Sequence, residues 1–256
     1  MSSHVEATIW HDMHCHLDFL ANPGAVAREL ASLGVDALSA TVTPDGFERA
    51  GRSFAGATNV RVGVGLHPWW VADGTCGPGD VARAAELAAA RRYVAEVGLD
   101  FAHGRDASAD AQVAALDAIL AACEGGGHVL SIHAVRSAGA VLDLLEAHGT
   151  CANNDAILHW FSGTGNELAR ARKMGCLFSV GPRMLATRRG REYAHQIPVG
   201  RLLLETDLPG SPEEGATLSP TAIAEGLRGA LDVIAKLHGE DAPPKIARHS
   251  ARLLGL

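Results

Sequence analysis

Short apolar runs alternate with helix-like segments along almost the whole chain. Eight of the runs are expected to form strands, over residues 8–15, 35–43, 60–66, 93–99, 128–134, 156–161, 176–181 and 201–207. The segments between them have helical periodicity, most clearly over residues 25–34, 80–92, 110–126, 137–149 and 166–175. Strand followed by helix, repeated eight times, predicts an α/β fold of the (β/α)8 TIM-barrel type.

Glycines and prolines mark where these segments end. Four predicted helices end at glycines that are expected to be left-handed, namely Gly34, Gly125, Gly149 and Gly175. After the last strand, a loop rich in proline, glycine and glutamate covers residues 208–220, and two further helices follow over 221–239 and 245–256. The loop turns the chain where it can form one wall of a site.

The length of 256 residues and the 47% hydrophobic content suit a single domain spanning 1–256, with residues 1–8 as a flexible extension. No run approaches the ~20 apolar residues that span a bilayer, and no signal segment is evident. We therefore expect a cytoplasmic protein without membrane contact. The five cysteines are odd in number and lack CxxC spacing, which favours reduced thiols over a disulfide framework or a thiolate zinc site.

The net charge of −7 argues against broad nucleic-acid affinity through a basic surface. It does not exclude a nuclease, because bound divalent cations reverse the local field and attract phosphate.

The stretch DMHCHLD, residues 12–18, opens the candidate chemistry. His14 and His16 are two apart on a predicted strand, so their imidazoles project from the same face and can share one cation. Two histidines at this spacing are weak evidence alone, since a surface strand can carry them by chance.

Other histidines and acids also occupy the ends of predicted strands, namely His67, Glu96, His133, His159 and Asp207. Taken singly, each has an ordinary explanation, such as a satisfied core histidine, an aromatic cluster beside Trp160 or a salt bridge. In a barrel, however, the carboxyl ends of all strands meet at one face, so these side chains should converge on one pocket. Burying them unpaired would cost several kcal/mol. The group therefore favours a metal site.

Imidazoles and carboxylates suit zinc, manganese or magnesium, and a central carboxylate can bridge two ions. We assign Glu96 as the bridge, with a first ion held by His14, His16, Glu96 and Asp207 and a second by Glu96, His133 and His159. Such a pair, ~3.5 to 4 Å apart, activates water and clamps the oxygens of a phosphoryl displacement. Asp207 would orient that water and take its proton, while Glu205 lies one step deeper and would orient a ligand or contact substrate.

Taken together, these motifs resemble the TatD family of metal-dependent deoxyribonucleases, a branch of the amidohydrolase-like TIM barrels. The matching stretches are DMHCHLD (12–18), GLHP (65–68), VAEVGLDF (94–101), SIHA (131–134), LHWFSG (158–163) and LLLETDLP (202–209). The resemblance implies 3′-to-5′ exonuclease or DNase activity with Mg2+, Mn2+ or Zn2+. It places metal roles on His14, His16, Glu96, His133, His159 and Asp207, and a phosphate or substrate role on His67 and Glu205.

Three segments, residues 130–148, 157–163 and 175–185, are also similar to the TatD-like nucleases of Qat anti-phage defence systems. That similarity implies a setting in bacterial defence, with the other Qat-type proteins as partners.

The substrate walls depart from the family pattern. Trp69 and Trp70 follow the GLHP turn where relatives tend to have a polar residue, Leu208 to Gly210 replace a serine-proline-tyrosine run, and His249 replaces an asparagine. One tryptophan is expected to pack on the barrel and the other to stack on a base of single-stranded DNA or a DNA end. Arg136 and Arg183 directly follow strands, which favours phosphate contact, whereas Arg189 and Arg191 are expected on a solvated helix face.

Two other functions stay open from the residues alone. The same barrel and ligand types polarise carbonyls, so an amidohydrolase or lactonase acting on a small compound is an alternative. Such enzymes often place a lysine at the end of strand four, where this chain has Glu96. A non-enzymatic metal-binding subunit of a larger complex is the second alternative, although a scaffold has no need of an open coordination position.

Overall fold

The computed structural model describes residues 10–256, and its eight parallel strands pair in chain order from β1 to β8. The strands are β1 (Trp10–Cys15), β2 (Val35–Ala40), β3 (Val60–Leu66), β4 (Tyr93–Asp100), β5 (Val129–Val135), β6 (Asp155–His159), β7 (Leu177–Val180) and β8 (Leu202–Leu204). This arrangement confirms the predicted (β/α)8 barrel. The expected flexible extension, 1–8, lies outside the described residues.

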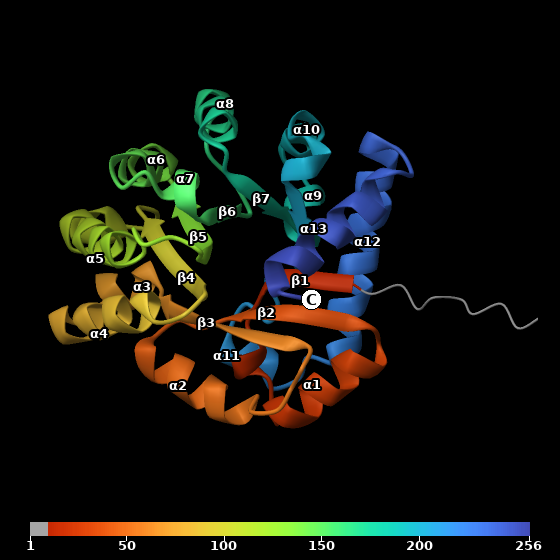
Figure 1. The fold of residues 1–256 in the computed structure, drawn as a ribbon, viewed down its shortest axis with the longest axis horizontal. Helices are drawn as coiled ribbons and strands as arrows, with labels where there is room; N and C mark the ends of the chain where they lie inside the picture. The colour runs from red at the N-terminus through yellow and green to blue at the C-terminus, as the bar shows by residue number, and fades with distance from the viewer. Residues whose placement is uncertain (1–9) are drawn as a thin grey trace, which may run out of the picture.

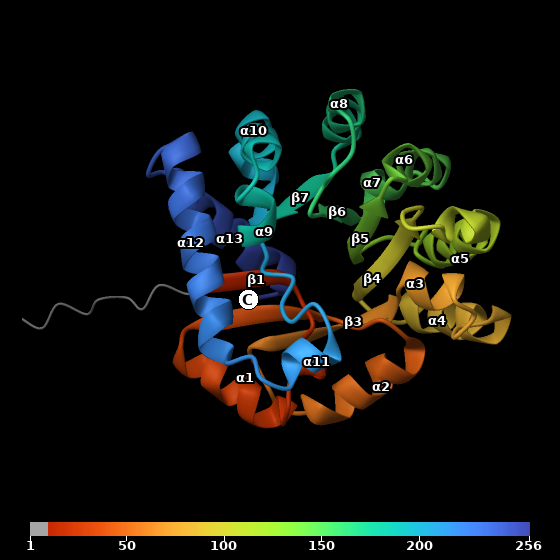
Figure 2. The ribbon, with the colours of Figure 1, turned by 180° about the vertical axis from the view of Figure 1, so that it is seen from behind.

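Helices surround the strands on the outside of the barrel (Figures 1 and 2). They are α1 (Pro23–Ser32), α2 (Pro44–Ser53), α3 (Pro68–Ala72), α4 (Pro78–Ala89), α5 (Ala109–Ala122), α6 (Ala138–Ala147), α7 (Thr150–Asn153), α8 (Gly165–Met174), α9 (Pro182–Leu185), α10 (Arg188–Gln196), α11 (Pro212–Gly215), α12 (Pro220–His238) and α13 (Ala242–Leu254). Many begin at a proline, whose fixed φ and missing N–H suit the first helical turn. Among the described residues, no helix has the length and apolarity needed to cross a membrane.

Two apolar layers hold the barrel together. The larger layer lies between strands and helices, and a smaller cluster fills the barrel with side chains from most of the strands, including Met13, Leu38 and Ile157. Leu253 and Leu254 of α13 belong to this inner cluster, so the last helix plugs the amino-terminal end of the barrel. All five cysteines are free thiols, as expected, and four of them are buried.

The seam between β1 and β8 is closed by residues beyond the regular part of β8. The Asp207 N–H donates to the His14 carbonyl and the His16 N–H donates to the Leu208 carbonyl, both at 2.9 Å. The predicted last strand, 201–207, is therefore too long, because β8 ends at Leu204 and Asp207 is left-handed with φ of 56°. The turn at Asp207 swings its side chain toward the open end of the barrel.

The glycine predictions hold at three of four helix ends. Gly34, Gly149 and Gly175 have φ of 70°, 57° and 96°. The expectation for Gly125 is wrong, because α5 already ends at Ala122 and the left-handed residues of the following turn are Gly126 and Gly127. Glycine is also required inside the barrel at Gly98, where φ is 149° and an added Cβ would lie 2.1 Å from the His133 carbonyl oxygen.

Candidate metal centre

A cavity of about 550 Å³ opens at the carboxyl ends of the strands. It brings together side chains from most strand ends, as the sequence predicts, and its lining includes His16, His67, Glu96, His133, His159 and Asp207. His14 and Glu205 are fully buried just outside this lining, at 0% and 1% exposure. Arg136 is exposed and lines a neighbouring cavity instead.

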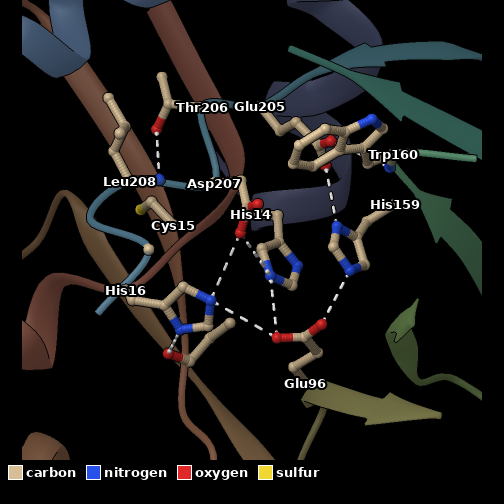
Figure 3. A network of polar contacts seen from close by, with 12 residues as sticks. His14, Cys15, His16, Glu96, His159, Trp160, Glu205, Thr206, Asp207 and Leu208 are labelled. Carbon is tan, nitrogen blue, oxygen red and sulfur yellow. Dashed lines mark hydrogen bonds and ion pairs between the residues drawn. The ribbon is translucent and has the colours of Figure 1, made fainter. Parts of the chain in front are cut away.

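Glu96 lies at the centre of the cluster and turns its two oxygens toward different imidazoles. Figure 3 shows it between His14 and His16 on one side and His159 on the other. Its Oε2 lies 3.4 Å from His14 Nε2 and 3.5 Å from His16 Nε2. Its Oε1 lies 2.7 Å from His133 Nδ1 and 2.8 Å from His159 Nε2. Burial raises the pKa of Glu96, but the surrounding imidazoles hold it well below its usual range, so this carboxylate is ionised and available to two sites.

Asp207 completes the His14 and His16 side of the cluster. Its Oδ1 lies 3.8 Å from His14 Nε2 and 3.5 Å from His16 Nε2. Burial opposes ionisation of Asp207, but its hydrogen bond with His16 and the nearby imidazoles lower its pKa to about 2. His14, His16 and Asp207 thus gather on the Oε2 side of Glu96.

The ring nitrogens on this side are arranged as ligands. His16 Nδ1 donates to the Ala40 carbonyl at 3.2 Å, so Nε2, which faces Glu96 and Asp207, is the nitrogen that would give up its proton to a bound cation. His14 Nδ1 is hydrogen-bonded to Ser131 Oγ at 2.6 Å, while its buried Nε2 has no hydrogen-bond partner in the part of the chain that the structure describes. A buried, unpartnered nitrogen beside ionised carboxylates is what a cation would satisfy. The donor set therefore fits a divalent metal.

Among residues 10–256, three groups of side chains bring ligand atoms within 4.8 Å of one another. They are His14–His16–Glu96, His14–His159–Glu205 and His67–Glu96–His133. The first belongs to the expected first ion. The other two contain the expected second-ion ligands His159 and His133, and each adds a residue that the sequence suggested for another role, Glu205 or His67.

His67 is a hydrogen-bond donor in this arrangement. Its Nδ1 accepts the Trp69 backbone N–H at 3.2 Å, so the neutral ring carries its proton on Nε2, which lies 3.4 Å from Glu96 Oε1. Burial lowers the pKa of His67, which favours this neutral form. An N–H directed into the cavity suits contact with a substrate oxygen better than metal ligation.

Glu205 is held beneath the cavity. Its Oε2 accepts from Ser179 Oγ at 2.5 Å, and its Oε1 accepts from the Trp160 backbone N–H at 3.0 Å. Burial and the charge of Asp207 raise the pKa of Glu205 well above its usual range. Through the Trp160 N–H, Glu205 holds the start of the loop after β6, and Figure 3 shows this carboxyl beside His159 and Trp160.

The cavity wall is built by the loops after β3, β4 and β7. Trp69 is 41% exposed, whereas Trp70 packs partly buried against the core. Arg183 also lines the cavity, with Nη1 3.8 Å from Asp207 Oδ2. Arg105, which the sequence analysis did not single out, lies with its guanidinium carbon 4.8 Å from the Trp69 ring centroid.

Arg189 and Arg191, which were expected on a solvated helix face, are exposed. Each of them also donates a hydrogen bond to a backbone carbonyl. Arg189 donates to the Ser162 carbonyl at 3.1 Å, and Arg191 donates to the Leu185 carbonyl at 2.7 Å. These contacts shape the loops after β6 and α9.

Asp100 also lines the cavity, and the sequence analysis did not single it out. Its position at the end of β4 was the sequence feature that could have identified it as a lining residue.

Comparison with known proteins identifies the family of the chain. A profile of the family described as TatD related DNase matches residues 11–249. The uncharacterized metal-dependent hydrolase YjjV of Escherichia coli strain K12 is 27% identical over 245 residues, which cover 90% of this chain and 91% of YjjV. The 3′-5′ ssDNA/RNA exonuclease TatD of Edwardsiella piscicida is 36% identical over 119 residues, which cover 45% of each protein.

The fold comparison agrees over nearly the whole length. The crystal structure of YjjV matches with a TM-score of 0.79 at 22% identity, covering 96% of this chain and 98% of that one. A TatD family hydrolase from Entamoeba histolytica matches with a TM-score of 0.78 at 14% identity. These likenesses establish a shared barrel.

Proposed function

Because the chain belongs to the TatD-related DNase family of metal-dependent hydrolases, we propose that it is a two-metal phosphodiesterase that acts on DNA. The proposal rests on the observation that the two oxygens of the Glu96 carboxylate face different histidines. Its Oε2 faces His14 and His16, while its Oε1 faces His133 and His159. A carboxylate with imidazoles on both oxygens is suited to bridge two ions.

The proposed ligands follow from this division. His14, His16, Asp207 and Glu96 would hold one ion, and Glu96, His133 and His159 the other, with Mg2+, Mn2+ or Zn2+ compatible with such nitrogen and oxygen donors. Divalent ions held by these residues would supply Lewis acidity toward the phosphodiester and would make water a stronger nucleophile at neutral pH.

The protein's own groups position the substrate and move the proton. Asp207 is ionised and lines the cavity, so it is placed to accept a proton from the attacking water. His67 directs its Nε2–H into the same cavity and is placed to donate to a phosphate oxygen. Arg183, beside Asp207, adds a fixed positive charge for the phosphate.

The wall suits a single strand or a DNA end. The exposed Trp69 offers a ring for an unpaired base, and Arg136 extends a basic surface from the adjoining cavity. The similarity of part of the chain to a 3′-5′ ssDNA/RNA exonuclease supports a nucleic-acid substrate cut from its 3′ end. A cytoplasmic role in anti-phage defence with Qat-type partners rests on the segments 130–148, 157–163 and 175–185 and stays a prediction from the sequence.

The test is an assay of the purified protein on 3′- and 5′-end-labelled single- and double-stranded DNA with Mg2+, Mn2+ or Zn2+. We expect metal-dependent cleavage, faster on single strands, with products that shorten from the 3′ end. A matched panel of lactones and N-acyl compounds is assayed in parallel. Cleavage of these carbonyl substrates together with intact DNA under every metal condition would replace the proposal by the amidohydrolase or lactonase alternative.

A further inference from the structure

Asp100 is a buried carboxylate that lines the cavity but has no part in the proton movements proposed above. It closes β4, the strand that carries Glu96, and its side chain is 2% exposed. Gln112 fixes the backbone on both sides of it, accepting the Asp100 N–H at 2.8 Å and donating to the Asp100 carbonyl at 3.0 Å. The carboxylate therefore has a defined position at the edge of the metal centre.

Four donors converge on this carboxylate. Its Oδ2 accepts from Trp69 Nε1–H at 2.5 Å, from the Arg105 guanidinium at 3.1 Å and from His133 Nε2 at 3.2 Å. Its Oδ1 accepts the Ala102 backbone N–H at 2.8 Å. An ionised carboxylate has no proton to give, so each partner must donate, and His133 Nε2 carries a proton toward Asp100. Nδ1 faces the ionised Glu96 and is therefore the nitrogen that would give up its proton to a bound ion.

This contact decides which nitrogen of His133 faces the metal centre. With Nε2 engaged by Asp100, the other nitrogen, Nδ1, lies 2.7 Å from Glu96 Oε1 and 3.3 Å from His159 Nε2. Histidine ligands in proteins generally give their second ring nitrogen to a carboxylate or carbonyl, which fixes the ring and its tautomer. Asp100 has that geometry toward His133.

The same carboxylate anchors the substrate wall. Arg105 and Trp69 stack on one another with 4.8 Å between the guanidinium carbon and the ring centroid, and both donate to Asp100 Oδ2. We propose that Asp100 is a positioning residue that orients His133 toward the second ion position and ties this ligand to the Trp69–Arg105 wall. The inference rests on the proposed metal pair and is independent of which substrate is cleaved.

The first measurement counts ions held by the metal-loaded protein during dialysis against rising chelator concentrations. Asp100→Asn keeps the shape of the side chain but places an amide N–H2 against groups that donate to the carboxylate. We therefore expect the second ion to be lost at a chelator concentration ~10- to 100-fold lower than in the wild type. The first ion should be retained as in the wild type. Trp69→Phe is the matched control, because it removes one donor from Asp100 without touching His133, and its ion retention should equal that of the wild type.

The second measurement needs no variant and remains decisive if Asp100→Asn does not fold. Nitrogen-15 histidine spectra of the metal-loaded wild-type protein should show His133 protonated at Nε2 and unprotonated at Nδ1. The reverse tautomer, or unchanged retention of both ions in a folded Asp100→Asn protein, would overturn the inference. A wild-type protein that holds only one ion would instead contradict the proposed metal pair, and the tautomer of His133 would still decide the role of Asp100.

Discussion

Thr206 donates both its backbone N–H and its hydroxyl to the carboxylate of Asp12, at 3.0 and 2.5 Å. Asp12 belongs to β1 and is completely buried, while Thr206 lies just beyond the end of β8. The pair therefore joins the first and last strands directly beside His14 and Asp207. This link explains why Asp207, the candidate proton acceptor, lies beside the candidate ligands His14 and His16 although β8 itself ends at Leu204.

The first prediction concerns this pair. Thr206→Val keeps the side-chain shape but leaves Asp12 Oδ2 buried without its hydroxyl donor. We expect the free energy of unfolding, measured in urea, to fall by ~1–3 kcal/mol, because an unsatisfied buried acceptor carries a desolvation penalty. Thr206→Ser retains the hydroxyl and should stay much closer to the wild type. Equal stability of the valine and wild-type proteins would show that the hydroxyl contributes nothing to the seam.

The second prediction concerns metal content. Glu96→Gln replaces the shared carboxylate by a neutral amide of the same shape, so bound divalent ions should fall from two per chain to one or none by elemental analysis. His67→Ala is the control, since His67 presents an N–H toward Glu96 and should leave the stoichiometry unchanged. Two ions retained in Glu96→Gln would remove Glu96 from the bridging position.

The third prediction separates two acids of the same loop. Asp207→Asn removes the proposed proton acceptor, and turnover should drop by ~10² or more while the protein remains folded. Glu205→Gln should retain most of the turnover. Because its pKa is raised well above the usual range, Glu205 is already neutral, and an amide can still accept from Trp160 N–H and bond to Ser179.

Initial rates on labelled DNA, together with metal content, provide the measurement for both variants. The opposite ranking, with Glu205→Gln inactive and Asp207→Asn near normal, would transfer the acceptor role to Glu205.

The convergence of the candidate ligands could be predicted from the sequence. His14, His16, Glu96, His133 and His159 all stand late in apolar runs, and the topology of a parallel barrel brings such positions to one end. Local patterning is sufficient there, because strand direction and strand order determine where these side chains meet.

The surroundings of the ligands could not be predicted in the same way. Residues 205 and 207 have the same strand parity, yet the left-handed turn at Asp207 turns its carboxylate toward His16 while Glu205 remains beneath Trp160. The joint contact of Trp69 and Arg105 with Asp100 likewise depends on loops from different strands. Such contacts arise only from tertiary packing, which hydrophobic periodicity does not encode.

The last prediction concerns the two tryptophans after β3. Trp69 is 41% exposed in the cavity wall, while Trp70 is partly buried and packs on the core. If Trp69 stacks on an unpaired base, worth ~1 to 3 kcal/mol per base, Trp69→Ala should raise KM for single-stranded DNA several-fold or more. The KM for a small chromogenic phosphodiester should change much less, with metal content as in the wild type.

Trp70→Ala is the matched comparison, because it removes the neighbouring indole from the same turn. The loss of the Trp70 indole should lower the melting temperature, because packing is lost, and should lower the rate on both substrates in proportion to the folded fraction.

A duplex has no free base face, so Trp69→Ala should also reduce the ratio of the cleavage rate on single-stranded DNA to that on duplex DNA. Equal losses on DNA and the small phosphodiester would show that Trp69 supports the wall without stacking. An unchanged KM in Trp69→Ala would leave Arg183 and Arg136 as the groups that bind the strand.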